Sequence, residues 1–208
     1  MPTTLIVFTR SPEPGKTKTR LIPALGPDGA ANLQRQMTEH TLRQAQIWQE
    51  HSEHRVEVHF TGSSREQMQQ WLGSQWYYLP QAEGGLGDRL ASAIQPHLTH
   101  SQGQNSVLVI GIDCPGINPT ILSQATTALT THDIVLGPTT DGGYYLIGLR
   151  QWQPSLFADI AWSTDQVFKE TCDRAQQLHL TVATLALLRD VDYPEDLEVW
   201  DAIQAQRG

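Results

Sequence analysis

Residues 5–20 read LIVFTRSPEPGKTKTR, a short apolar run that passes directly into a polar loop. An uncharged apolar run of this length is typical of a strand buried on both faces. The loop after it holds two prolines, one glycine and four Lys or Arg residues between positions 10 and 20. In open α/β sheets, ligands bind beyond the carboxyl ends of the strands. The stretch therefore predicts the first strand of an α/β fold, followed by a ligand-binding loop.

Strands and helices alternate along the rest of the chain. Short apolar or alternating runs predict strands, and between them apolar residues recur at helical spacing. This alternation indicates βαβ crossovers, and hence a three-layer sandwich around a mostly parallel sheet. Predicted strands span residues 5–9, 56–61, 76–79, 107–112, 134–137, 144–149 and 181–185, and predicted helices span residues 28–50, 65–72, 88–100, 119–131 and 164–179.

Two of these helices carry capping signals at their starts. Asn118 precedes Pro119, which places a capping residue before a proline at the first helical position. Residues 163–166 read STDQ, which fits a capping box.

Length and composition favour one globular domain over residues 1–208. Hydrophobic residues make up 39% of the chain and charged residues 17%, which suits a protein with a core. The formal net charge of −8 disfavours nucleic-acid polymers as partners. No apolar run approaches the ~20 residues of a membrane span, and the N-terminus does not resemble a signal peptide. We therefore expect a cytoplasmic protein.

The loop at residues 10–20 predicts a phosphate-binding site. Free backbone N–H groups and a local excess of Lys and Arg allow an acidic protein to bind a diphosphate or triphosphate. The loop matches neither the P-loop pattern nor GxGxxG. The alternative is a solvated basic turn.

A carboxylate follows another predicted strand, in the sequence VLVIGIDCP at residues 107–115. Asp113 should lie at the carboxyl edge of the sheet, where it could bind Mg²⁺ or Mn²⁺ that bridges phosphates. The alternative is a turn-forming Asp before proline. Asp192, in the sequence DVDYPEDL at residues 190–197, could complete this metal site, or it could cap the final helix.

The turn DGGYY at residues 141–145 predicts a site for a sugar or an acceptor. Asp-Gly-Gly is first of all a turn signal, but Gly142 and Gly143 would also let a ligand approach the backbone. Tyr144 offers a hydroxyl beside a flat face. Trp162 and Ser163 precede a predicted helix N-terminus, where an anionic or polar ligand is favoured.

Taken in order, these motifs resemble the nucleotide-diphospho-sugar transferase superfamily, which has the glycosyltransferase-A fold. More narrowly, the chain resembles the bacterial radical-SAM/selenodomain-associated, or arsenosugar-biosynthesis-type, glycosyltransferases. One departure is Tyr193, where that family usually has Thr, so capping of the last helix would fall to Asp192. The resemblance spans nearly the whole chain, with matching motifs at residues 10–21, 84–89, 111–115, 141–146, 162–164 and 190–197.

The resemblance implies roles for individual residues. Asp113 would hold the metal, Asp192 would be a second ligand, and residues 84–87 would lie near the base. Apart from the resemblance, Asp141 is the best-placed carboxylate for the general base that an inverting reaction requires. The nucleotide would be bound by Arg10, Gly15, Lys18, Arg20, Gly85 and Gly87, and the sugar or acceptor by Gly142, Gly143, Tyr144, Trp162 and Ser163.

The expected activity is metal-dependent transfer of a sugar from a nucleotide-diphosphate donor to a small-molecule acceptor. A nucleotidylyltransferase like those that guanylylate phospholactate is the first alternative, and it would release pyrophosphate. A non-catalytic nucleotide-sugar binder is the second. Residues 134–177 contain three Lys or Arg residues, Arg150, Lys169 and Arg174, and none is placed to hold a second phosphorylated substrate. This scarcity favours a neutral sugar.

Overall fold

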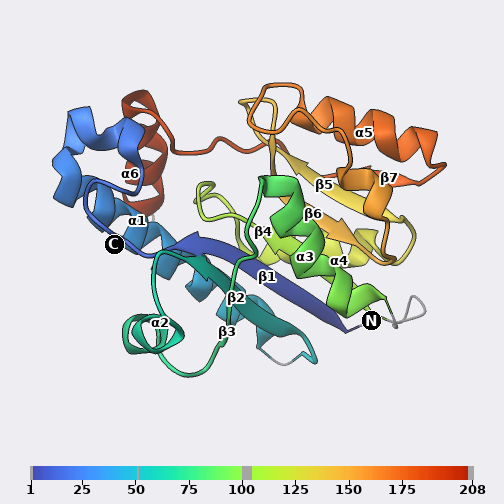
Figure 1. The fold of residues 1–208 in the computed structure, drawn as a ribbon, viewed down its shortest axis with the longest axis horizontal. Helices are drawn as coiled ribbons and strands as arrows, with labels where there is room; N and C mark the ends of the chain where they lie inside the picture. Colours follow the sequence, from blue (N-terminus) through green and yellow to red (C-terminus); the bar gives the residue numbers. More distant parts are fainter. Residues whose placement is uncertain (1, 51, 100–104, 206–208) are drawn as a thin grey trace.

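The computed structural model describes residues 2–50, 52–99 and 105–205, whose strands form one seven-stranded sheet (Figure 1). The strand order is β3-β2-β1-β4-β6-β5-β7, and β6 runs antiparallel to both of its neighbours. The predicted single-domain α/β fold with a mostly parallel sheet is thereby confirmed. The strands are β1 (Thr3–Arg10), β2 (Arg55–Thr61), β3 (Tyr77–Pro80), β4 (Ser106–Ile110), β5 (Ile134–Pro138), β6 (Tyr144–Leu149) and β7 (Val182–Thr184).

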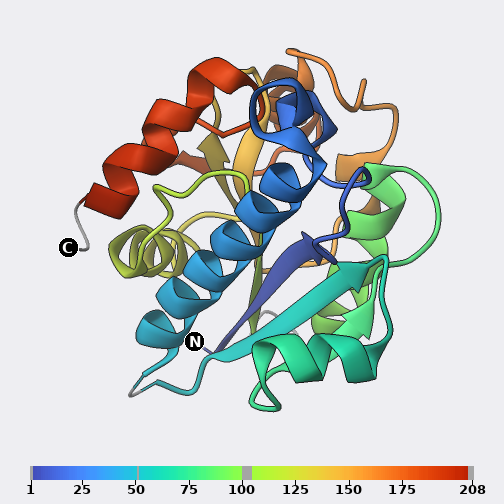
Figure 2. The ribbon, with the colours of Figure 1, turned by 90° about the vertical axis from the view of Figure 1, so that its left-hand side faces the viewer.

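Helices cover both faces of the sheet. On one face α1, α2, α4 and α6 pack through residues such as Met37, Met68, Leu122 and Trp200. Figure 2 shows α1 lying along this face with α4 and α6 beside it. On the other face α3 and α5 pack against β1, β4, β5 and β6. The helices are α1 (Ile22–Gln49), α2 (Arg65–Leu72), α3 (Leu86–Leu98), α4 (Pro119–Ala128), α5 (Val167–Gln177) and α6 (Leu197–Ala205), with short 3₁₀ turns η1 (Thr19–Leu21), η2 (Pro154–Phe157) and η3 (Pro194–Asp196).

The antiparallel strand β6 positions the DGGYY turn. The six parallel strands end at one edge of the sheet, and β6 begins at that edge because a tight turn connects it to β5. The loops after β1 and β4 and the turn before β6 therefore share one edge, where ligands bind in such sheets.

Helix starts are where the structure differs most from the predicted boundaries. The first helix begins at Ile22 and bends at Gly26, whose φ of 70° interrupts the helical conformation. The predicted capping box at residues 163–166 is wrong, because α5 begins at Val167 and has no side-chain cap. The cap at Asn118 is confirmed by its Oδ1 atom, which accepts a hydrogen bond from the Ile121 N–H. The predicted third helix extended to His100, which lies outside the described residues.

In the described residues, no helix is long and apolar enough to cross a membrane.

Candidate active site

Three adjoining cavities open at the carboxyl edge of the sheet. The strand-end cavity, of about 400 Å³, lies over β1 and β4 and includes Phe8, Gln81 and Leu86. The loop cavity, of about 340 Å³, is lined by residues 16–20, Arg10 and Gln34. The acidic cavity, of about 700 Å³, includes six Asp residues, at positions 113, 141, 165, 190, 192 and 196. Asp192 lines both the loop cavity and the acidic cavity, and Asp113 lines both the strand-end cavity and the acidic cavity.

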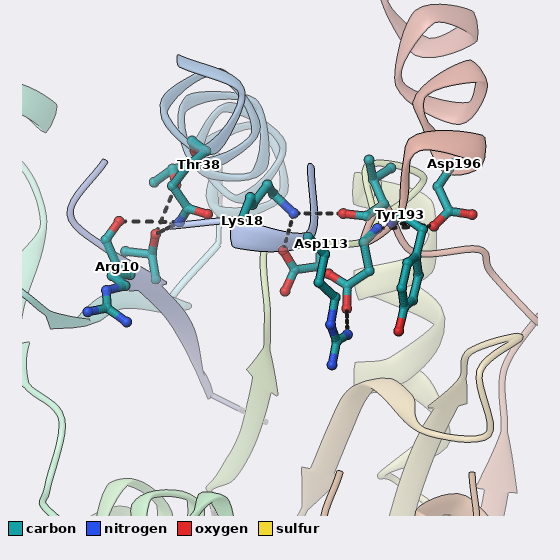
Figure 3. A network of polar contacts seen from close by, with 11 residues as sticks. Arg10, Lys18, Thr38, Asp113, Tyr193 and Asp196 are labelled. Carbon is teal, nitrogen blue, oxygen red and sulfur yellow. Dashed lines mark hydrogen bonds and ion pairs between the residues drawn. The ribbon is translucent and has the colours of Figure 1, made fainter. Parts of the chain in front are cut away.

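Lys18 joins the basic loop to two other parts of this edge. Its Nζ atom donates to Asp113 Oδ1 at 2.6 Å and to the Val191 carbonyl at 2.8 Å (Figure 3). The side chain is only 4% exposed, and the backbone has a left-handed φ of 43°. Lys18 therefore has its charge neutralised by Asp113 and holds the loop against the segment after β7.

Arg20 is the more accessible cation of the loop. Its NH1 atom lies 3.0 Å from Asp192 Oδ2, and its guanidinium lies over the Tyr193 ring, 5.1 Å from the ring centre. The side chain is 59% exposed. Two other predicted phosphate-binding residues, Arg10 and Gly15, are also exposed, and Arg10 lines the loop cavity. Gly15 has a φ of 78° and open space around its Cα, which suits a tight loop.

The two predicted metal ligands both line the acidic cavity. Burial and the nearby charge of Asp113 raise the pKa of Asp192, so the two carboxylates repel each other. Asp113 accepts from Lys18 through Oδ1, and Asp192 accepts from Arg20 through Oδ2. The second oxygen of each carboxylate accepts no hydrogen bond from a described side chain.

This donor set fits Mg²⁺ or Mn²⁺. Such ions usually keep several waters and take one or two carboxylates together with substrate phosphates. The described residues contain no group of three or more His, Cys, Asp or Glu that could form an all-protein metal cage.

Asp192 is not needed as a helix cap. The backbone N–H groups of Asp192 and Tyr193 both donate to Asp196 Oδ2, at 3.2 and 2.8 Å. The expectation that Asp192 would replace Thr as the cap is therefore wrong. Asp196, three positions after Tyr193, instead accepts from the two N–H groups that precede the helix, and Asp192 lines the cavity.

Two further carboxylates of the acidic cavity have different surroundings. Asp141 Oδ1 accepts hydrogen bonds from the Thr139 hydroxyl at 2.5 Å and the Gly143 N–H at 2.9 Å. Asp190 pairs with no described Lys, Arg or His. Burial, and then the charge of Asp141, raise the pKa of Asp190 to about 6. Our sequence reasoning did not select Asp190. The signal available was its place in DVD, two residues before Asp192.

The DGGYY turn contributes less to the cavity than the sequence predicted. Gly143 and Tyr144 line the acidic cavity, but Gly142 does not. A Cβ at Gly142 would lie 2.1 Å from the Asp165 carbonyl oxygen, so this glycine allows close packing of the backbone rather than of a ligand. The Tyr144 hydroxyl is buried, which raises its pKa, so Tyr144 presents its ring to the cavity instead of its hydroxyl.

Trp162 and Gly87 meet at the rim of the acidic cavity. A Cβ at Gly87 would lie 2.6 Å from Trp162 Nε1, so the indole packs against the first turn of α3. Trp162 and Ser163 both line the cavity, and Ser163 has a left-handed φ of 66°. Gly85 is the N-cap of α3, and its N–H donates to Asp88 Oδ2 at 2.9 Å.

The sequence matches one described family. The family described as "Uncharacterized protein conserved in bacteria (DUF2064)" matches residues 41–164, which is more than half of the chain. No protein of curated function matches the chain.

Solved structures resemble the chain over nearly its whole length. A protein from Desulfovibrio desulfuricans G20, provisionally assigned as a nucleotide-diphospho-sugar transferase, is 28% identical with a TM-score of 0.83, covering 99% of this chain and 98% of that one. A 4-diphosphocytidyl-2C-methyl-D-erythritol synthase from Anaerococcus prevotii DSM 20548 is 11% identical with a TM-score of 0.61, covering 100% and 96%. A CMP:2-keto-3-deoxy-manno-octonic acid synthetase in complex with CTP is 12% identical with a TM-score of 0.59, covering 100% of both chains.

The two more distant neighbours share the fold alone. The Desulfovibrio protein, at 28% identity, supports the prediction that this chain is an enzyme of the transferase class.

Proposed function

The chain belongs to the DUF2064 family, and we propose that it is a metal-dependent glycosyltransferase with a nucleotide-diphosphate sugar as donor and a small neutral acceptor. The resemblance to the Desulfovibrio protein supports a nucleotide-sugar substrate. The motifs at residues 10–21 and 190–197 support the narrower grouping with arsenosugar-biosynthesis-type glycosyltransferases.

The charge of the acidic cavity is the observation that carries this proposal. Among the described residues that line it, Arg20 is the one Lys, Arg or His, against six Asp residues. Nucleotidyl transfer to a phosphorylated co-substrate would place additional negative charge in the same space, where carboxylates would repel it. A neutral acceptor avoids that repulsion, and carboxylates are good hydrogen-bond acceptors for its hydroxyl groups.

The basic loop binds the donor diphosphate in this proposal. Arg20 and Arg10 are exposed at the loop cavity and can donate charge-assisted hydrogen bonds to phosphate oxygens. The base and ribose occupy the strand-end cavity, near Gly85 and Leu86. Lys18 does not contact the diphosphate in this proposal. It neutralises the charge of Asp113 and holds that side chain in place.

Asp113 and Asp192 are the residues that would hold Mg²⁺ or Mn²⁺. The ion would stabilise the negative charge that develops on the leaving nucleoside diphosphate. Asp141 Oδ1 is fixed by the turn, so the other carboxylate oxygen is available to accept the proton of an acceptor hydroxyl. Trp162 and the Tyr144 ring form flat walls against which a sugar ring can pack.

The products distinguish this proposal from its nearest alternative. The protein should first be screened by thermal shift with ADP-, CDP-, GDP-, UDP- and TDP-linked sugars, with and without Mn²⁺. A ligand at ~100 times its Kd stabilises the native state by about 2.7 kcal/mol. With a stabilising donor, we expect release of nucleoside diphosphate. Pyrophosphate release from a nucleoside triphosphate and a phosphorylated co-substrate would instead establish nucleotidyl transfer. Stabilisation without turnover would favour a binding protein.

A further inference from the structure

His40 occupies an unusual position for an imidazole. It lies on the buried face of α1 and is 5% exposed, within the apolar layer formed by residues such as Met37, Ile117 and Trp200. Its Nε2 atom lies 2.9 Å from the Pro115 carbonyl oxygen, and its Nδ1 atom is buried without a partner. Because a carbonyl oxygen only accepts hydrogen bonds, Nε2 must carry the hydrogen.

A half-satisfied imidazole costs stability in an apolar layer. A leucine would fill similar space without leaving a buried lone pair unpaired. The bond from Nε2 is therefore the feature that distinguishes His40 from the apolar residues around it.

That bond reaches the turn that carries Asp113. The turn leaves the sheet after Ile110, and Pro115 has no N–H with which to anchor itself. On one side, the Val191 N–H donates to the Asp113 carbonyl at 2.8 Å. On the other side, His40 holds the carbonyl two residues later. Two carbonyl groups of the turn, those of Asp113 and Pro115, are thus anchored, the first by the Val191 N–H and the second by the His40 side chain.

The same ring also contacts α6. The imidazole and Trp200 rings meet edge to face, with centres 5.8 Å apart and planes at 87°. α6 begins directly after η3, and Asp192 lies just before η3. His40 therefore contacts both of the segments that bring Asp113 and Asp192 to the acidic cavity.

We infer that His40 is a positioning residue, whose Nε2–H hydrogen bond to Pro115 fixes the Asp113 turn in the geometry that the site requires. This role rests on the proposed function for its effect on ligand binding, but the effect on the turn itself can be measured without any ligand.

The test compares four variants by amide hydrogen exchange of residues 111–118. His40→Leu keeps the packing and removes the donor, whereas His40→Gln places a donor near the position of Nε2. His40→Asn places its donor near Nδ1 instead. Thr41→Val is the matched control, because the Thr41 hydroxyl is also buried on α1 without a partner.

We expect exchange in residues 111–118 to be about tenfold faster in His40→Leu and His40→Asn, and near the wild-type rate in His40→Gln and Thr41→Val. Unchanged exchange in His40→Leu, or equal acceleration in His40→Gln and His40→Leu, would overturn the inference. If His40→Leu does not fold, the comparison of His40→Gln with His40→Asn decides in the same way.

A second readout links the turn to the site. Titration calorimetry with ADP, CDP, GDP, UDP and TDP in the presence of Mn²⁺ should show about tenfold weaker binding by His40→Leu and recovery in His40→Gln. Loss of binding by both variants would show that His40 contributes only to packing. If the wild-type protein binds none of these nucleotides, the proposed function fails, and the exchange measurement alone decides the role of His40.

Discussion

Lys18 and Arg20 lie two residues apart in one loop and pair with two acids of one cavity, yet their surroundings differ. Lys18 is almost fully buried and has its donors directed at Asp113 and a backbone carbonyl. Arg20 is mostly exposed and lies on a tyrosine ring. Two cations of one motif can thus have different roles. Lys18 stabilises the structure of the site, whereas Arg20 is accessible to a ligand.

Asp113→Asn tests the acid that Lys18 holds, and we expect the largest effect. The amide oxygen can still accept from Lys18, so the fold should persist. Loss of the negative charge should lower metal-dependent turnover by at least ~100-fold, as removal of a main electrostatic group does. Steady-state rates with and without Mn²⁺ measure this effect, and Asp173→Asn, on the exposed surface of α5, is the control. Retained metal stimulation would mean that Asp113 is only a turn residue.

Lys18→Met tests the buried cation through stability. The change leaves the Val191 carbonyl without its side-chain donor and Asp113 without its cation, so the free energy of unfolding should fall by about 2 kcal/mol. Urea denaturation measures this change. Arg20→Met should reduce stability by less than ~1 kcal/mol, because its ion pair is exposed. Equal losses in the two variants would remove the distinction between them.

Arg20→Ala tests the exposed cation through binding. A charge-assisted contact to phosphate is worth ~1.5–3 kcal/mol, so nucleoside diphosphate affinity should fall about tenfold or more. Titration calorimetry at fixed ionic strength measures it, with Lys169→Ala as the control, because that side chain lies on α5 and does not line the three cavities. An unchanged Kd would reduce the loop to a solvated turn.

Asp190→Asn tests an acid that pairs with no described cation, and its effect depends on pH. Because the folded-state pKa is raised to about 6, ionisation of Asp190 opposes folding. Stability is unaffected below the unfolded pKa of about 4, decreases as the pH rises from there to about 6, and stays lower above it. The variant should therefore gain stability relative to wild type between pH 4 and pH 7, as thermal unfolding at both pH values would show. A difference in stability between variant and wild type that does not change with pH would mean that Asp190 is solvated.

The positions of the strands and of the motifs along the chain could be predicted from sequence, because apolar runs and turn residues report local structure. Lys18 could be placed in the loop for the same reason. Its pairing could not be predicted, because it depends on a left-handed backbone at residue 18 and on a segment more than 170 residues away. Gly142 was interpreted as space for a ligand, but the Asp165 backbone occupies that space. A glycine in a sequence indicates that another group can approach the backbone closely, but it does not indicate whether that group is a ligand or another part of the chain.

The close contact between Gly87 and Trp162 has a consequence for the evolution of the family. Any side chain at position 87 would overlap the indole, since even a Cβ would lie 2.6 Å from Nε1. The two positions, 75 residues apart, therefore cannot vary independently while this packing is kept. In homologous chains, alanine or serine at position 87 should be accompanied by a smaller residue than tryptophan at position 162, so that the two columns covary.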